Sequence, residues 1–489
     1  MSAITRRRFF TDIGMGFPAV VLAEMLHRDG FARADETGAA GWKPPDGRPH
    51  FAPRAKNVIW LFMIGGTSHL ESFDPKPALN RYAGKTIAET PFADTLKNKL
   101  TGNLRVLLQD QPELHVRRTL YPLQVGSAKQ GESGIEISDW WPCVGSCVDQ
   151  IAVIRSMWTT DNDHGAQLQF HTGRHMLEGQ FPTIGSWVHY GLGSLSDNLP
   201  RFVVIGSPIA DCCGGLGGHG ASYLGPEHDG IQLSVDPQNP LPFATPAKDV
   251  FREEQAGEFE LLGRLNQLSA LKYPLDSALR ARIKSYELAF RMQTAVPEVM
   301  QLSGEAPATE KLYGLDMDVT RSFGRMCLTA RRMVERGVRF VQVFHGSNGG
   351  AGGWDAHSDL RQNHADQCAQ VDRPIAGLLT DLKQRGLLDE TIVVWATEFG
   401  RTPGSEGKDG RDHHPYGFSV WMAGGGIKGG IVHGATDEIG YHATVDRHYV
   451  TDIHATLLHQ LGLDPRRLEV PGHKRLDIDF GQVIRDILA

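Results

Sequence analysis

The sequence predicts an α/β domain built on a largely parallel sheet, and three observations support this fold class. The chain has 489 residues, of which 40% are hydrophobic, which is enough for a sizeable core. Short, almost continuously apolar runs bounded by turn residues recur along it, as expected for strands buried on both faces. Segments with helical periodicity separate several of these runs, an alternation typical of parallel sheets covered by helices.

Five apolar runs are predicted to be the strands of this sheet. Each consists almost entirely of aliphatic and aromatic residues, without the polar alternation of a half-exposed strand. They cover residues 58–64, 202–205, 340–344, 392–396 and 418–423.

Two helices are predicted around the later strands. Residues 371–385 carry apolar side chains at helical spacing, and Gly386 ends the pattern. A second pattern of this kind follows Thr451-Asp452 and ends at Gly462. We expect both helices to pack on the sheet.

A large insertion is predicted in the middle of the chain, over about residues 211–336. Its first part, 211–249, is rich in Gly and Pro and is typical of a loop or lid. Its second part, 251–336, has helical periodicity and mixed charge. The chain is therefore expected to be one elaborated domain and not a series of independent ones.

The N-terminus has the pattern of a twin-arginine export signal over residues 1–34. Arg6, Arg7 and Arg8 precede a modestly apolar stretch at 13–26, and Ala32-Arg33-Ala34 follows as a small-residue cleavage pattern. The alternative is a basic amphipathic first helix of the mature fold. The export reading implies the twin-arginine machinery as a partner and a periplasmic or extracellular protein, with a leader or linker at 35–54.

Composition excludes several classes of partner. Lys+Arg 50 against Asp+Glu 57 gives a net charge of −7, and no basic run occurs beyond the N-terminus, so nucleic acid is not an expected partner. No apolar run reaches the about 20 residues that span a bilayer, so no stable membrane span is predicted. The six Cys form no Cys-x-x-Cys knuckle, which argues against an iron–sulfur or structural zinc site, and the sequence leaves their pairing open.

Metal-competent side chains gather at the boundaries of four predicted strands. In open parallel sheets, ligands bind outside the carboxyl ends of the strands, so these boundaries are where a site is expected. They carry Glu71 and Asp74 after the first strand, His345, Asp355 and His357 after the third, Glu398 and Arg401 after the fourth, and Asp412, His413 and His414 before the fifth.

This mixture of carboxylates and imidazoles predicts a divalent ion, which could be Zn²⁺, Mn²⁺, Mg²⁺ or Ca²⁺. Each residue alone has a structural alternative, such as a helix cap for Asp355 or an ion pair of Glu398 with Arg401. Their shared placement at successive strand boundaries favours the metal site. The other late histidines, such as His433, His442 and His473, are predicted to lie at the surface.

Several motifs together resemble the DUF1501 family, whose members are often described as sulfatase-like. The resemblance covers nearly the whole mature chain. It rests on Asn57 to His69 with Phe73-Asp74-Pro75-Lys76-Pro77, His171-Thr172-Gly173-Arg174, Trp354-Asp355-Ala356-His357, Glu398-Phe399-Gly400-Arg401-Thr402-Pro403, Gly410-Arg411-Asp412-His413 and Ala423 to Gly430. It implies the fold of the alkaline phosphatase/sulfatase superfamily over residues 55–489, a three-layer αβα arrangement, and descent from two-metal hydrolases.

The resemblance also implies a set of metal ligands. Asp355 and His357 resemble the Asp and His of the superfamily's first metal site, and His413, or alternatively His414, resembles its late His. Glu398 matches an Asp at the end of a strand, whereas Phe399 replaces the adjacent His, so one ligand is missing there. Glu71, or alternatively Asp74, occupies the region of the carboxylate after the first strand.

The resemblance weakens at the nucleophile. Counting back from Thr172-Gly173-Arg174 puts the nucleophile slot at Asp163, beside His164, and the chain has no Cys-x-Pro-x-Arg or Ser-x-Pro-x-Arg signature for a formylglycine mechanism. Water could attack instead, with His164 or Asp163 as general base. The other readings are a nucleophile from a neighbouring turn, namely Thr159, Thr160 or Ser133, and a degenerate binding site. Arg174 and Arg401 are candidates to bind the anionic group of a substrate.

The function expected from these residues is that of an exported, metal-dependent hydrolase of sulfate or phosphate esters. Its substrate would be a small molecule or a polysaccharide. The alternative is a non-catalytic envelope protein that retains the fold to bind glycans or a partner. The absent nucleophile and Phe399 favour that alternative.

Overall fold

The structure is a computed structural model that describes residues 45–97, 117–196, 198–235, 252–273, 283, 287, 290–292 and 296–489. The export signal predicted over 1–34 lies outside the described residues. The chain divides into two units. One comprises 45–468 and 475–489 and contains all the helices and strands below. Of the other, 1–44 with 469–474, the structure describes only 469–474, where Val470 and His473 form an antiparallel bridge.

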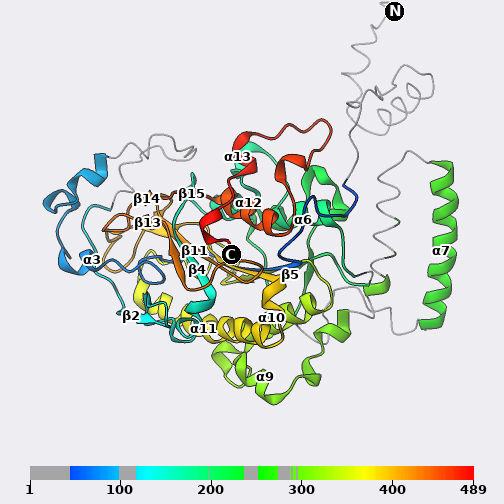
Figure 1. Ribbon diagram of the computed structural model, residues 1–489, viewed down its shortest axis with the longest axis horizontal. Helices are drawn as coiled ribbons and strands as arrows, with labels where there is room; N and C mark the ends of the chain where they lie inside the picture. Colours follow the sequence, from blue (N-terminus) through cyan, green and yellow to red (C-terminus); the bar gives the residue numbers. More distant parts are fainter. Residues whose placement is uncertain are drawn as a thin grey trace, which may run out of the picture. The chain divides into compact units, whose positions relative to one another are not determined.

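A nine-stranded sheet, counted over the described residues, forms the centre of the larger unit (Figure 1). Its order is β12-β4-β11-β8-β1-β7-β5-β6, and β15 also pairs with β4. The strands are β1 Asn57–Met63, β4 Ile151–Trp158, β5 Phe202–Ile205, β6 Ile231–Leu233, β7 Phe340–His345, β8 Thr391–Ala396, β11 Phe418–Ala423, β12 Ile431–His433 and β15 His448–Tyr449. Every pairing is parallel except the two made by β11, which is antiparallel to both β4 and β8. The predicted α/β class with a mostly parallel sheet is confirmed.

The side chains of β1 show how the sheet is buried on both faces. Ile59, Leu61 and Met63 belong to a core that includes apolar residues of helices α10, Asp318–Glu335, and α11, Leu360–Gln384. Trp60 and Phe62 point the other way, where their rings lie 5.5 and 5.6 Å from that of Phe170 in α5, Gly165–Thr172. Because alternate residues of a strand face opposite sides, helices cover both faces and the domain has three layers.

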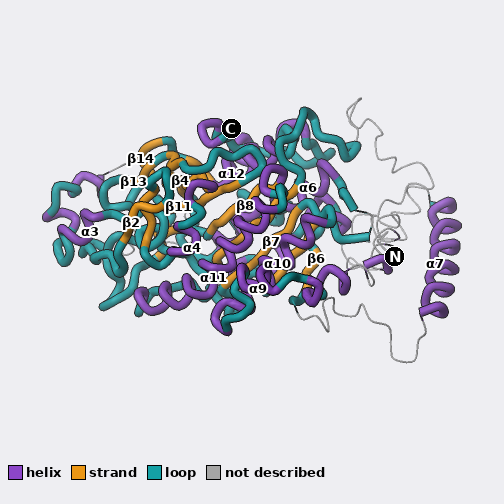
Figure 2. Tube along the Cα trace, turned by 60° about the horizontal axis from the view of Figure 1, so that its bottom comes forward, coloured by secondary structure: helices purple, strands orange, loops and turns teal. Residues whose placement is uncertain are grey.

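Two further helices complete the layer that contains α5. They are α6, Ile184–Leu192, and α12, Val450–Gln460. The ring of His454 in α12 lies 6.1 Å from that of Trp60, on the same face as α5. Figure 2 shows α6 and α12 on one side of the strands and α10 and α11 on the other.

The five predicted strands and both predicted helices are present, with one change of length. The helix predicted over 371–385 is α11, which begins at Leu360 and includes Pro374 in its interior. The prediction followed the apolar spacing, and most residues of the first part of α11, 360–370, are polar. The strand β4 escaped prediction because Arg155 and Ser156 interrupt its apolar run.

The remaining elements are short or lie in the insertion. The helices are α3 Pro77–Arg81, α4 Pro142–Gly145, α7 Arg252–Lys272, α9 Pro307–Leu312 and α13 Asp477–Phe480, and the strand pairs are β2 Ser127–Gln130 with β3 Ile135–Ser138, β9 Gly400–Arg401 with β10 His413–His414, and β13 Ala435–Thr436 with β14 Ala443–Val445. Within the described part of the insertion, residues 211–228 form short 3-10 turns. All six cysteines are free. Among the described residues no helix has both the length and the apolar composition needed to cross a bilayer.

Candidate metal centre

Four side chains from distant parts of the chain meet beside the sheet. Asp355 and His357 lie in the segment between β7 and α11, His413 lies in β10, and His164 is the residue before the first turn of α5. One ligand atom from each lies within 4.8 Å of the others. The structure therefore brings together three predicted ligands, Asp355, His357 and His413, and adds His164, which the sequence suggested as a base.

The carboxylate of Asp355 is the centre of this cluster. Its Oδ1 lies 3.1 Å from His357 Nε2 and 3.1 Å from His413 Nε2, and its Oδ2 lies 3.3 Å from His164 Nε2. His164 Nε2 is buried and lacks the alignment of a hydrogen bond. The Nε2 atoms of His357 and His413 are 2.9 Å apart.

The opposite nitrogen of each imidazole has an acceptor of its own. His164 Nδ1 lies 3.1 Å from Glu398 Oε1, His413 Nδ1 donates to the carbonyl of Asn162 at 2.8 Å, and His357 Nδ1 pairs with Glu406. An acceptor at Nδ1 places a proton on that nitrogen, so each ring, when neutral, offers its Nε2 atom as the ligand atom.

The charges of the cluster follow from its burial. Burial acts to raise the pKa of Asp355, but the three imidazoles and the Arg401 guanidinium hold that pKa well below its usual range. Burial acts to lower the pKa of His164, whereas the carboxylates of Asp355 and Glu398 raise it to about 9. Asp355 raises the pKa of His357, and burial lowers that of His413. The carboxylates of the cluster thus favour a positive charge beside them, which either protons on the imidazoles or a bound cation can supply.

These residues fit a divalent ion. Bare Nε2 atoms of His357 and His413 at 2.9 Å would repel one another unless a proton or a cation lay between them. Three imidazoles and one carboxylate form a donor set of the kind that binds zinc, and acceptors on the outer nitrogens are the usual support of such ligands. His357 is the most accessible of the four, with 39% of its side chain exposed, so the cluster reaches solvent on that side.

The four clustered residues all lie within the part of the chain that a protein-family model matches. The model described as "Protein of unknown function (DUF1501)" matches residues 55–488. The chain belongs to the DUF1501 family. The predicted membership is therefore confirmed over nearly the whole described fold.

The comparison with solved structures found matches of low sequence identity. The PsFucS1 sulfatase from Pseudoalteromonas sp. shares 14% identity at a TM-score of 0.33, with 89% of this chain and 72% of that chain covered. The alkaline phosphatase from the Antarctic bacterium TAB5 shares 12% identity at 0.31, covering 80% and 96%. The lipoteichoic acid synthase LtaP from Listeria monocytogenes shares 8% identity at 0.35, covering 90% and 80%. No curated protein sequence matches the chain.

Glu398 lies behind the cluster and not in it. Its buried carboxylate accepts the backbone N–H of Gly65 at 2.9 Å and the side-chain amide of Gln167 at 3.0 Å, besides meeting His164 Nδ1. The structure therefore places Glu398, which the sequence offered as a ligand, where it orients the His164 ring. Phe399 follows it, and its ring lies 4.5 Å from that of His413.

Arg401 is fully buried and bonded to the protein. It donates to Asp355 Oδ1 at 2.7 Å, to the Gly66 carbonyl at 2.8 Å and to the Arg411 carbonyl at 3.1 Å. Gly65 permits this close packing, because a Cβ there would lie 2.6 Å from the Asp355 nitrogen at φ +123°. Arg401 therefore holds the segment that carries Asp355. The sequence instead suggested that it contacts the anionic group of a substrate.

The acidic residues after β1 pair with other groups. Glu71 forms an ion pair with Arg411 at 2.7 Å, and both side chains are fully buried. Asp74 pairs with Lys76 at 2.9 Å. The structure thus places neither Glu71 nor Asp74 in the four-residue cluster.

The remaining candidates from the sequence also have other partners. Arg174 donates to Asp479 Oδ2 and Glu178 Oε2, each at 3.0 Å. Asp163 is exposed, and its carboxylate accepts the backbone N–H of His164 at 2.7 Å.

The hydroxyl alternatives and His414 lie outside the cluster as well. Thr159 and Thr160 bond the side chain of Gln169, and Ser133 bonds Asp149 through its backbone. His414 is buried against the Tyr441 carbonyl.

Sequence reasoning missed the residues that support the ligands, namely Asn162, Gln167 and Glu406. Asn162 acts through its backbone carbonyl, which leaves no trace in the sequence. Gln167 and Glu406 follow His164 by three residues and His357 by 49, so only the first has a helical spacing that could have been noticed.

The late histidines correct one expectation. His433 and His442, predicted at the surface, are buried with 8% and 1% exposure, whereas His473 is exposed. His433 Nε2 lies 2.9 Å from His448 Nε2, so a second imidazole occupies the position that water would have at the surface.

Proposed function

We propose that this protein is a metal-dependent hydrolase of sulfate or phosphate esters, with one divalent ion at the His164–Asp355–His357–His413 cluster. The observation that carries the proposal is the convergence of three imidazole Nε2 atoms on one carboxylate, each ring supported at Nδ1. Three imidazoles around one carboxylate, each held by an acceptor at Nδ1, form the donor set of a metal site. The family membership and the predicted superfamily are consistent with this role.

Asp355, His357 and His413 would hold the ion, and Zn²⁺ is the best match. Imidazole nitrogens favour borderline ions, whereas Mg²⁺ and Ca²⁺ prefer oxygen ligands. When bound, the ion supplies Lewis-acid polarisation of the ester and charge neutralisation. Arg401 keeps Asp355 in place through its 2.7 Å contact, so the carboxylate does not have to reorient.

His164 is the best candidate for a general base once a bound cation offsets the carboxylates that raise its pKa. Its Nδ1 is held at 3.1 Å by Glu398, and a carboxylate at that position stabilises the imidazolium that forms when Nε2 takes a proton. Asp163 is less suited, since its carboxylate is engaged by the His164 backbone. In this scheme water is the nucleophile, and neither a formylglycine nor a serine is required.

Neither basic residue suggested by the sequence is placed to bind the anionic group of a substrate. Arg174 and Arg401 are both bonded to carboxylates of the protein. Neutralisation of the sulfate or phosphate group would therefore fall to the ion.

Metal content tests the proposal directly. Protein purified without chelators should contain about one divalent ion per chain, and His413→Ala or Asp355→Ala should lose it. His473→Ala, which removes an exposed histidine, should keep the metal. Wild-type protein that neither retains nor takes up Zn²⁺ or Mn²⁺ would refute the proposal.

A non-catalytic binding protein is the second candidate, and His164 supports it as well. If His164 is a fourth ligand, the shell is complete, as in structural zinc sites, and no position remains for a substrate. The two roles differ in the His164→Ala variant. If His164 is a base, the variant should retain the metal, and its turnover of aryl phosphates or sulfates should fall by about 10²–10⁴-fold. If His164 is a ligand, the variant should bind the metal more weakly.

A further inference from the structure

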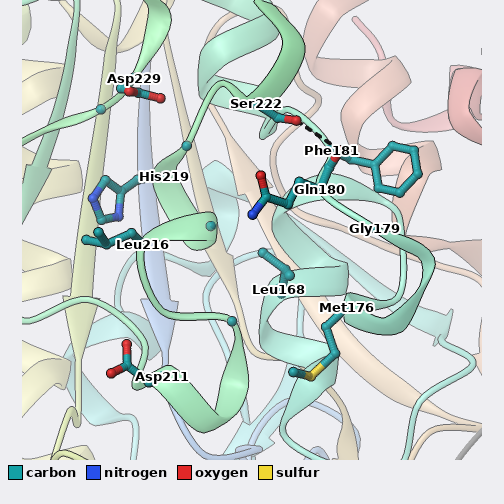
Figure 3. Close-up of a pocket in the computed structure, with 14 residues that line it drawn as sticks. Leu168, Met176, Gly179, Gln180, Phe181, Asp211, Leu216, His219, Ser222 and Asp229 are labelled. Atoms are coloured by element: carbon teal, nitrogen blue, oxygen red, sulfur yellow. Dashed lines mark hydrogen bonds between the residues drawn. The ribbon is translucent and has the colours of Figure 1, made fainter. Parts of the chain in front are cut away.

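A cavity of about 560 Å³ lies beside helix α5, and the proposed function does not use it (Figure 3). Its walls come from α5, from the segment after Arg174 and from residues 211–230 of the insertion. The volume is in the range of small-molecule sites. The serine hydroxyl of Ser222 donates to the Gln180 carbonyl at 2.9 Å and joins two of these walls.

The cavity lies next to the metal centre along α5. Leu168, which lines it, is four residues after His164, so the two side chains share one helix face about 6 Å apart along the axis. Met176, a second lining residue, has its Sδ 2.9 Å from the point that a Cβ on Gly165 would occupy. The cavity and the cluster therefore lie at neighbouring turns of α5.

The polar lining is acidic or neutral. Asp211 and Asp229 contribute carboxylates, and Gln180 and His219 contribute an amide and an imidazole. None of the described lining residues is a lysine or an arginine, so an anionic group would be repelled from the cavity. The cavity therefore suits an uncharged part of a substrate, and the anionic ester group would lie at the adjacent cluster.

His219 is the clearest unsatisfied group in this lining. It is 6% exposed, and its Nδ1 has no partner among the described residues. Burial lowers its pKa, so the ring is neutral and offers one donor and one acceptor. Nδ1 is closed to solvent, so a ligand hydroxyl would meet this ring at Nε2.

The remaining lining is apolar or lacks side chains. Leu168, Met176 and Leu216 present aliphatic surface, and five glycines leave backbone exposed, at 179, 214, 217, 220 and 230. A ligand with several hydroxyls around an apolar ring face matches both parts of the wall.

We propose that this cavity binds a neutral saccharide ring. Resting on the proposed function, this ring would carry the sulfate or phosphate ester that reaches the metal centre. Carboxylates and the His219 ring would bond its hydroxyls, and the aliphatic side chains would contact its C–H face.

Binding of uncharged sugars tests this without any turnover. Methyl glycosides of glucose, galactose, mannose, fucose and xylose are titrated by calorimetry and by saturation-transfer NMR, beside glucuronate and glucosamine. At least one neutral glycoside should bind saturably and glucuronate more weakly. Asp211→Ala should weaken that binding about tenfold, the loss expected for one hydrogen bond to a charged group.

Two further variants make the result specific. His219→Phe should also weaken binding, whereas Asp389→Ala, which removes another exposed aspartate, should not. Asp355→Ala should retain saccharide binding, so a failure of the metal-centre proposal is seen separately as a loss of hydrolysis. The saccharide proposal is overturned if no neutral glycoside binds, if only glucosamine binds, or if Asp211→Ala and His219→Phe both bind as wild type.

Discussion

Six buried histidines predict an unusually steep loss of stability in mild acid. They are His69, His171, His345, His364, His414 and His454, and burial lowers the pKa of each from 6.5 to about 3 or 4. Their rings are buried and neutral in the native state. In the unfolded chain they would bind protons below pH 6.5.

The size of the effect follows from proton linkage. A group with a lowered native pKa stabilises the native state fully above its unfolded pKa, and this contribution is lost as the pH falls below 6.5. Each group costs about 1.4 kcal/mol per pH unit in that range. Between pH 7.5 and 5.5 six groups together remove about 8 kcal/mol from the free energy of unfolding, against about 5–15 kcal/mol for a typical domain.

His164 acts in the opposite direction. Its pKa is raised to about 9, so its contribution is full below pH 6.5 and is lost as the pH rises toward 9. Between pH 7.5 and 5.5 His164 adds only about 1 kcal/mol to the free energy of unfolding, so the net effect of acid remains strongly destabilising.

Urea unfolding at pH 7.5 and 5.5 measures this difference. A chelator is included at both values so that pH-dependent metal binding does not contribute. His171→Leu should reduce the loss by about 1.4 kcal/mol, since one titrating group is removed, whereas His473→Gln, at an exposed position, should leave it unchanged. A wild-type loss below about 2 kcal/mol would refute the assignment of neutral buried rings.

Three other changes test the surroundings of the metal centre. Glu71→Gln leaves the Arg411 charge buried without its partner and should cost about 3–5 kcal/mol in urea unfolding; a cost below about 1 kcal/mol would contradict the buried ion pair. Gly410→Ala places a Cβ 1.8 Å from the His357 carbonyl oxygen and should weaken metal affinity at least about tenfold, whereas Gly304→Ala, in open space, should not. Arg401→Met removes the contact to Asp355 and should reduce metal affinity about 10–100-fold by competition with a chelating dye; unchanged affinity would show that the carboxylate is held by other groups.

The fold was more predictable than the site because burial leaves a pattern along the chain. The apolar run 58–64 corresponds to β1, which is buried along its whole length. Strand β6, with three residues, and β15, with two, are too short to carry a pattern. The direction of β11 also leaves no mark, because its side chains are buried in either orientation.

For the site, the sequence supplied residue types but not their partners. Asp355 and His413 were indicated by their strand boundaries, and they meet as expected from that placement. Glu398 and Arg401 lie at the same boundaries, yet they do not belong to the cluster. Glu398 contacts His164, and Arg401 donates a hydrogen bond to Asp355. Residue type cannot separate a ligand from its support, because both roles use the same charged groups.

The antiparallel strand β11 has a consequence for how the metal centre is assembled. The parallel strands deliver site residues from the segments that follow them, whereas β11 runs the other way and delivers His413 from the segment that precedes it. Strand β11 lies between β4 and β8, whose sequence positions differ by more than 200 residues, so its pairing joins distant parts of the chain. His164, which follows β4, and His413, which precedes β11, are therefore brought together by this long-range pairing.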